Sequence, residues 1–127
     1  MKSLTYYLHK IRNFFIDIKW AVQTARRGYS DGDIYSIRDW FLTIMPKMLR
    51  EFDRQRISHP CTMTDSEWGD ILNRMAVLLE RSNPDYWESK LSEDYTKEEL
   101  LECFEQTRKH WNMFLDMWKE YFFDLWY

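Results

Sequence analysis

The segment RRGYSDGDIY gathers two arginines, two aspartates and two glycines within ten residues. Its carboxylates could bind a cation, while its arginines and the start of a following helix could hold an anion such as a phosphate. A calcium loop requires further acidic ligands and a distal Glu, and a phosphate loop requires a Lys and a preceding strand, which this segment lacks. We therefore predict a corner between two helices, with a small-ligand or nucleotide site at this corner as the alternative. The residues of this candidate ligand corner are Arg26, Arg27, Tyr29, Asp31 and Asp33.

Two histidines and two cysteines, His59, Cys61, Cys103 and His110, supply the ligand types that zinc prefers. Cys103 and His110 are seven residues apart, or about 10 Å along a helix, which is too far for both to bind one ion without the loop pair. The cysteines lie far apart without a CxxC motif, which favours reduced thiols, with a single disulfide as the alternative. The sequence assigns no metal ligand, catalytic residue or cofactor, and we predict that the chain is not an enzyme.

Apolar residues near the start of the chain recur at alternating spacings of four and three, which predicts one helix of about six turns. Arg26 and Arg27 suit its last turn, where cations favour the negative end of the helix dipole. Gly28 suits the left-handed conformation that ends a helix. The apolar positions of this helix are Leu4, Leu8, Ile11, Phe15, Ile18, Val22 and Ala25.

A second helix is predicted directly after this corner. Ser30 and Asp33 have the spacing of a capping box at its start. Pro46 has no N–H for the carbonyl of Leu42, so we expect this helix to be kinked or split at Pro46. Its expected core positions are Ile34, Ile37, Phe41, Ile44, Met48 and Phe52.

Two further capping boxes, Thr64 with Glu67 and Thr96 with Glu99, predict a third and a last helix. No segment shows the alternation of a strand, and short connections favour antiparallel neighbours. The sequence therefore predicts an all-α fold, a compact four-helix assembly built as one domain over residues 1–127. The expected core face of the third helix is Trp68, Ile71, Leu72, Met75, Leu78 and Leu79.

The last helix is richer in apolar residues than one buried face requires. Of the 17 residues 111–127, twelve are apolar or aromatic. Trp, Tyr, Phe and Met are the residue types enriched at protein interfaces, so we predict that this helix presents a second face to a partner. The expected interaction surface consists of Trp111, Phe114, Trp118, Tyr121, Phe122 and Trp126.

Charge is distributed unevenly along the chain. Residues 1–56 carry 11 Lys and Arg against 6 Asp and Glu, a net charge of +5, whereas residues 57–127 carry 7 against 15, a net charge of -8. These halves could pair with each other or steer a charged partner. The chain as a whole is acidic and has no known nucleic-acid-binding motif, so nucleic acid is not an expected partner. No apolar run approaches the length that spans a bilayer, and we expect a soluble cytoplasmic protein that does not enter a membrane.

The segment AVQTARRGYSDGDIYSIRDWFLTIMPKMLREF resembles a segment of small uncharacterised proteins of bacteriophages and prophages. In those proteins a first helix ends in R-G-Y-S-D-x-D and a second carries a Trp and a P-x-M-L-R run. The following HPCTMTDSEWGDIL, with its Pro before an acidic cap, is similar in style to their next segment. The matching positions are Arg27, Gly28, Tyr29, Ser30, Asp31, Asp33, Trp40, Pro46, Met48, Leu49 and Arg50.

This resemblance implies a phage origin and no particular activity. Because small accessory phage proteins often bind host proteins or capture host signals, it favours a binding protein over an enzyme. We therefore expect a non-enzymatic accessory protein in the cytoplasm of the bacterial host. It would bind a host or phage protein, or a second copy of itself, through the aromatic face of the last helix and thereby modulate a host process.

Overall fold

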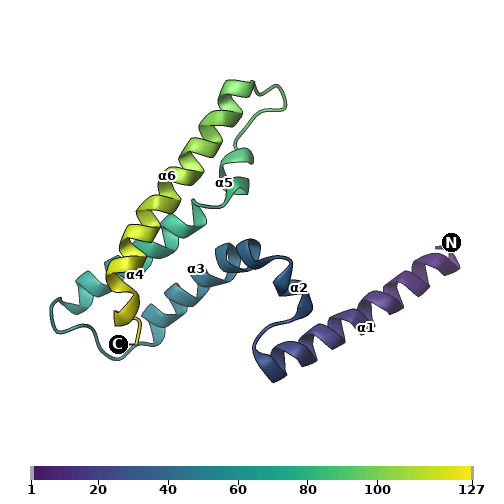
Figure 1. Ribbon diagram of the computed structural model, residues 1–127, viewed down its shortest axis with the longest axis horizontal. Coiled ribbons are helices and arrows are strands. Elements are labelled where there is room, and N and C mark those ends of the chain that lie inside the picture. The colour runs from purple at the N-terminus through teal and green to yellow at the C-terminus, as the bar shows by residue number, and fades with distance from the viewer. Residues whose placement is uncertain (1, 127) are drawn as a thin grey trace. The chain divides into compact units, whose positions relative to one another are not determined.

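A computed structural model describes residues 2–126 of the chain (Figure 1). These residues form helices and connecting loops and contain no strand, which confirms the all-α prediction. Three of the four expected segments are single long helices, and the second is divided into a short and a long helix. One further short helix and a 3₁₀ turn are added to them. The elements are α1 Leu4–Arg27, α2 Asp31–Ile34, α3 Ile37–Gln55, α4 Asp65–Glu80, α5 Pro84–Glu88, α6 Lys97–Tyr121 and η1 Phe122–Asp124.

The predicted helix ends are confirmed. Gly28 ends α1 with φ of 87°, in the left-handed region that favours glycine because a Cβ clashes there. Ser30 with Asp33 and Thr64 with Glu67 both form complete capping boxes. At the start of α6 one of the two bonds of the predicted capping box is described: the side chain of Thr96 accepts a hydrogen bond from the N–H of Glu99.

The second predicted helix was expected to be kinked or split at Pro46. It is divided, but not at Pro46, and a kink at this residue stays a prediction. α3 continues through Pro46, whose side chain is buried. Leu42 and Leu49 lie on either side of it in the same core, so tertiary packing offsets the hydrogen bond that proline cannot donate. The division falls instead at Tyr35 and Ser36, between α2 and α3.

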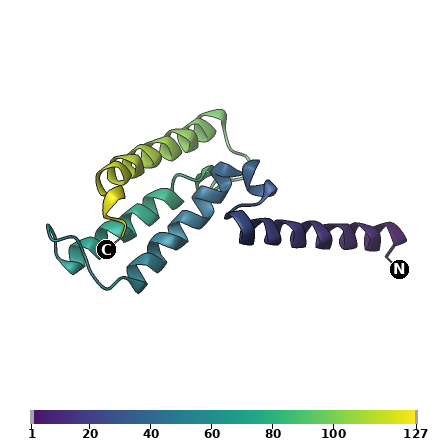
Figure 2. The same cartoon turned by 60° about the horizontal axis from the view of Figure 1, so that its bottom comes forward.

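Contacts divide the chain into two compact units, Met1–Trp40 and Phe41–Tyr127, which we call the N-terminal and C-terminal units. The expectation of a single domain stays a prediction. In the C-terminal unit α4 and α6 lie side by side, α5 lies against α6, and successive long helices run in opposite directions (Figure 2).

The C-terminal unit is built around one apolar core. α4 supplies most of it, and each of its predicted core positions is buried or packs against the buried cluster. α3 joins through Phe41, whose ring makes edge contacts with the rings of Trp111, Phe114 and Trp118 at centroid distances of 6.0 to 6.3 Å. Aromatic pairs of this geometry contribute about 0.5–1.5 kcal/mol each beyond area burial. The buried residues of the core are Leu42, Leu49, Trp68, Leu72, Met75, Ala76, Leu78, Leu79 and Phe114.

The core stripe predicted for the second helix is only partly correct. Ile34, Ile37 and Met48 are exposed. The break at Tyr35 and Ser36 separates α2 from α3, so one helical periodicity cannot continue across both. Phe41 and Phe52 pack against the core, as predicted, and the other residues of α3 that reach it are Leu42, Met45, Pro46 and Leu49.

Arg56 holds the connection between α3 and α4, a role that the sequence did not reveal. Its side chain is only 7% exposed, and its Nε donates a hydrogen bond to Asp53 Oδ1 at 2.8 Å. Its Nη1 donates to Asp65 Oδ1 at 2.6 Å and to the carbonyl of Ser58. These bonds raise the pKa of the guanidinium, with the bond to Asp65 as the largest cause. The planar guanidinium thus joins the end of α3, the loop and the start of α4.

Replacing this guanidinium destabilises the C-terminal unit. We expect Arg56→Gln to lower the free energy of unfolding by about 1.5–3 kcal/mol, because hydrogen bonds to charged groups are lost at a buried side chain. Urea denaturation measures this change. The matched control is Arg54→Gln, which removes an exposed pair with Glu51 and costs at most about 0.5 kcal/mol. Equal costs for the two variants would contradict the role given to Arg56.

Residues 2–40 of the N-terminal unit form no apolar core. Among residues 2–40 the single buried residue is Ser30, the capping residue of α2. No residue of α1 is buried, although α1 has 24 residues and carries the predicted apolar stripe. The sequence of α1 thus has the apolar periodicity of a helix that packs in a core, but its apolar side chains are not buried.

Candidate functional site

One face of α1 is apolar along its whole length and exposed. The exposed fraction is 75% for Leu4 and 64% for Phe15. Helices of this amphipathic type usually bury such a stripe against another element, so the exposed stripe of α1 is a candidate surface for contact. We call this surface the α1 apolar face: Leu4, Leu8, Ile11, Phe15, Ile18, Val22 and Ala25, all of them exposed.

The two edges of the α1 apolar face differ in chemistry. Three cations, Arg12, Lys19 and Arg26, each follow a residue of the face and repeat every seven residues, which places them in a row that we call the cationic edge. Two exposed aromatic residues, Tyr7 and Phe14, precede residues of the face and extend it on the other side. The surface thus combines a broad apolar strip with positive charge along one border.

α2 is attached to the opposite side of α1. Trp20 is two residues away from both Ile18 and Val22 in the stripe. Two residues correspond to about 200° of rotation, so Trp20 points away from the α1 apolar face. A Cβ added to Gly32 would lie 3.0 Å from the Trp20 ring, so α2 approaches that ring closely and a larger residue at position 32 would have to displace it slightly. α2 therefore lies on the side of α1 away from the stripe. Within the N-terminal unit, residues 2–40 leave the α1 apolar face uncovered.

Hydrogen bonds fasten this corner around Asp31. The side chain of Gln23 donates to Asp31 Oδ2 and accepts from the N–H of Asp31, both at 2.9 Å. Arg27 Nη2 donates to Asp31 Oδ1 at 2.6 Å, and its Nε donates to the carbonyl of Tyr29 at 3.0 Å. The guanidinium also lies over the Tyr29 ring, 4.5 Å from its centroid.

The five residues of the candidate ligand corner are thus brought together, and most of their polar groups serve the corner itself. Arg27 and Asp31 are paired with each other, and the carboxylate of Asp33 accepts from the N–H of Ser30 at 2.8 Å. Arg26 alone of the two arginines has no ion pair within residues 2–126. This arrangement supports a structural corner, and it leaves one open cation where an anion site would need several.

The titration of Asp31 tests this corner. The hydrogen bonds from Gln23 and then from Arg27 lower the pKa of Asp31 below its ordinary value of 3.8. Because the folded-state pKa is lowered, the stabilisation from this carboxylate is present above pH 3.8 and is lost as the pH falls through the lower folded value. A carbon-13 NMR titration should place the pKa below 3.8 and move it upward in Gln23→Ala. A value unchanged by that substitution would contradict the described contact.

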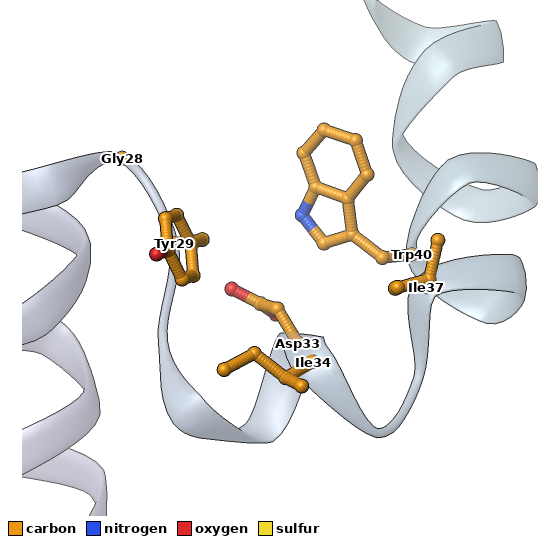
Figure 3. Close-up of a pocket in the computed structure, with 6 residues that line it drawn as sticks. All are labelled: Gly28, Tyr29, Asp33, Ile34, Ile37 and Trp40. Atoms are coloured by element: carbon orange, nitrogen blue, oxygen red, sulfur yellow. The ribbon is translucent and has the colours of Figure 1, made fainter.

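A hollow of about 290 Å³ adjoins the corner, within the N-terminal unit (Figure 3). The rings of Tyr29 and Trp40 stand on opposite sides of it, and the carboxylate of Asp33 lies between them. Ile34, Ile37 and Gly28 complete the lining, and Asp33 is its single charged residue. The lining favours an apolar or cationic group, so the hollow does not add to the predicted anion site.

The expected interaction surface of the last helix is divided by the structure. Phe114 is fully buried, so it belongs to the core and cannot contact a partner while the unit is folded. Trp111, Trp118 and Tyr121 are half-buried and pack against that core. Phe122 and Trp126 are exposed. An interaction through these last two residues stays a prediction.

The sulfur and imidazole groups do not form a joint site. Both thiols are free; Cys61 is exposed and Cys103 is buried. A ring nitrogen of His59 bonds the carbonyl of Pro60, and one of His110 bonds the carbonyl of Gln106. Across residues 2–126 no three His, Cys, Asp or Glu side chains are grouped as a metal ion requires.

A second hollow, in the C-terminal unit, is bordered by four carboxylates, those of Glu67, Asp70, Glu120 and Asp124. Burial is the first cause of a raised pKa at Tyr121 in its wall, followed by the nearby carboxylate of Glu120. Glu67 is already engaged in the capping box of α4. The remaining carboxylates give this end of the unit a negative potential.

None of the helices within residues 2–126 combines the length and the apolarity that crossing a bilayer requires. Comparisons of the chain with protein-family models, with curated proteins and with solved structures give no match. The periodicity of the α1 apolar face was visible in the sequence, but buried helices share this periodicity, so it did not indicate exposure.

Proposed function

We propose that this chain is a non-enzymatic interaction protein that binds a protein partner through the α1 apolar face. One observation carries the proposal: α1 exposes an apolar stripe from Leu4 to Ala25, and no apolar side chain among residues 2–40 is buried. A helix without tertiary contacts is only marginally stable in water, and burial of its apolar stripe is what stabilises it in a protein. Binding of a partner that covers this face would therefore be strongly favoured by the burial of apolar surface.

The chemistry of the surface supports a protein partner over a small ligand. The stripe is long and continuous, whereas small molecules bind in enclosed pockets with a few polar groups. Laying an amphipathic helix into an apolar groove or against another helix is a recurrent mode of recognition. The resemblance of residues 21–52 to phage proteins supports an accessory protein of phage type that acts on a host or phage protein.

Site-specific photo-crosslinking tests this proposal. A photoreactive side chain in place of Phe15 lies within the α1 apolar face, and one in place of Asn13 lies on the opposite side of the same helix. We expect irradiation in the source cells to attach a defined protein to the Phe15 position and not to the Asn13 position. Gel mobility and mass spectrometry identify the attached protein.

Two results would count against the proposal. If both positions attach the same mixture of abundant proteins, the contact is nonspecific. If neither position attaches a protein while a position at Phe123 does, the contact belongs to the C-terminal aromatic residues. Phe123 is 84% exposed and gives a matched aromatic control in the other unit.

A further inference from the structure

We propose that the partner segment bound by α1 is an acidic amphipathic helix, whose carboxylates pair with the cationic edge. This inference rests on the proposed function, because it names the partner class of the same surface. It is carried by the position of Arg12, Lys19 and Arg26 beside the α1 apolar face. A helix that covers the face brings its own flanking residues opposite this row.

The cations of this edge are available for such pairing. Within residues 2–126, Arg12 and Arg26 take part in no ion pair or side-chain hydrogen bond. Lys19 reaches only Asp31, with Nζ 4.0 Å from the carboxylate, and its side chain is 66% exposed. α1 contains five cations and one carboxylate, Asp17, so its net charge is +4. An approaching acidic helix is therefore attracted and oriented by charge.

A second copy of α1 satisfies this surface less well. In an antiparallel pair of identical helices the two cationic edges would face each other, which is repulsive. In a parallel pair each cationic edge would face the aromatic edge of the other helix, leaving every cation without a carboxylate. Either pair would bring two helices of net charge +4 together. An acidic helix avoids both costs while burying the same apolar side chains.

Two synthetic peptides provide the test. Both have about four heptads with Ile and Leu at the apolar positions; one has Glu and the other Lys at the flanking positions. Each peptide repels its own copies, so both are available for binding. By fluorescence anisotropy we expect the full chain to bind the Glu peptide about tenfold more tightly than the Lys peptide, with a preference that declines as salt rises.

Charge reversal on the edge gives the sharper result. Arg12→Glu with Arg26→Glu should shift the preference to the Lys peptide, because the edge then carries two carboxylates and one cation. The matched control is Lys2→Glu with Lys10→Glu, which changes the net charge equally away from the apolar face and should keep the preference for the Glu peptide. Circular dichroism checks that α1 remains helical in each variant.

The outcomes separate this inference from the proposed function. The chain could bind both peptides equally and lose this binding in the double variant Ile11→Ser with Ile18→Ser. That result would overturn the inference of an acidic partner but would leave the α1 apolar face as a binding surface. A dimer that forms without peptide and dissociates in that variant would identify a second copy as the occupant and also overturn the inference. Binding of neither peptide would overturn it as well, and the crosslinking experiment then decides whether α1 binds a protein at all.

Discussion

Phe114→Ala and Leu72→Ala should each lower the free energy of unfolding of the C-terminal unit by about 3–5 kcal/mol. Both side chains are fully buried, and removing either leaves a cavity in addition to the lost apolar burial. Phe114 also holds the ring contacts with Phe41, Trp111 and Trp118. Since domains of this size are stable by about 5–15 kcal/mol, either change removes a large share of the total. Urea denaturation followed by tryptophan fluorescence measures it.

The matched control for Phe114 is Phe15→Ala, the same truncation on α1. Phe15 is exposed, so its removal should change the unfolding free energy by at most about 0.5 kcal/mol. A cost at Phe15 comparable to that at Phe114 would mean that α1 contributes to the folded core. In that case its apolar face would not be a surface for a partner.

Ile11→Asp combined with Ile18→Asp should weaken binding of the crosslinked partner by about 100-fold or more. Burial of one Ile contributes about 1.5–3 kcal/mol, and each 1.4 kcal/mol corresponds to a tenfold change in affinity. The carboxylates would in addition have to be desolvated in the contact. Isothermal titration calorimetry of the purified partner with the unchanged chain and with the double variant measures the loss of affinity.

The control for this loss is Asn13→Asp, which introduces a carboxylate on the side of α1 away from the apolar face. Its affinity should stay within a few-fold of the unchanged chain. Both variants should keep the urea transition of the C-terminal unit, because no α1 residue is buried. Equal losses at Asn13 and at the apolar positions would indicate that helix formation, and not the face, governs binding.

Local chemistry explains what could be predicted from the sequence. The four-and-three spacing after Leu4, the glycine at position 28 and the two capping boxes at Ser30 and Thr64 each act within a few residues. Such signals depend on dihedral preference and on short-range hydrogen bonds, so they hold whatever the tertiary packing. They gave α1 and the starts of α2 and α4 correctly.

The second predicted helix shows what could not be predicted, and tertiary packing explains part of it. Pro46 disfavours a helix interior, yet the buried neighbours of α3 keep the helix continuous through it. Tyr35 and Ser36 have no strong helix-breaking character, yet the chain breaks there after the single turn of α2. At Pro46 the three-dimensional environment outweighs intrinsic propensity, whereas the break at the exposed residues Tyr35 and Ser36 has no structural explanation.

The candidate site shows the same limit. α1 and α6 both carry apolar stripes with helical spacing, and the sequence placed the partner surface on α6 because that helix is richer in aromatic residues. Phe114 is buried because Phe41 and the aromatic rings of α6 surround it, whereas Phe15 stays exposed and its ring meets only the adjacent, exposed ring of Phe14 among the aromatic residues of residues 2–40. Which stripe is covered depends on long-range contacts, which periodicity alone does not contain.

Amide hydrogen exchange of the purified monomer tests most directly the claim that the α1 apolar face is free for a partner. Protection depends on the free energy of local opening, which is low for helices without buried contacts and approaches the global value in a core. We predict that amides of residues 8–27 exchange orders of magnitude faster than those of residues 72–79, and slow markedly when the partner or the Glu peptide is added. A monomer whose α1 amides are as protected as those of α4, with no further slowing by partner or peptide, would contradict the account.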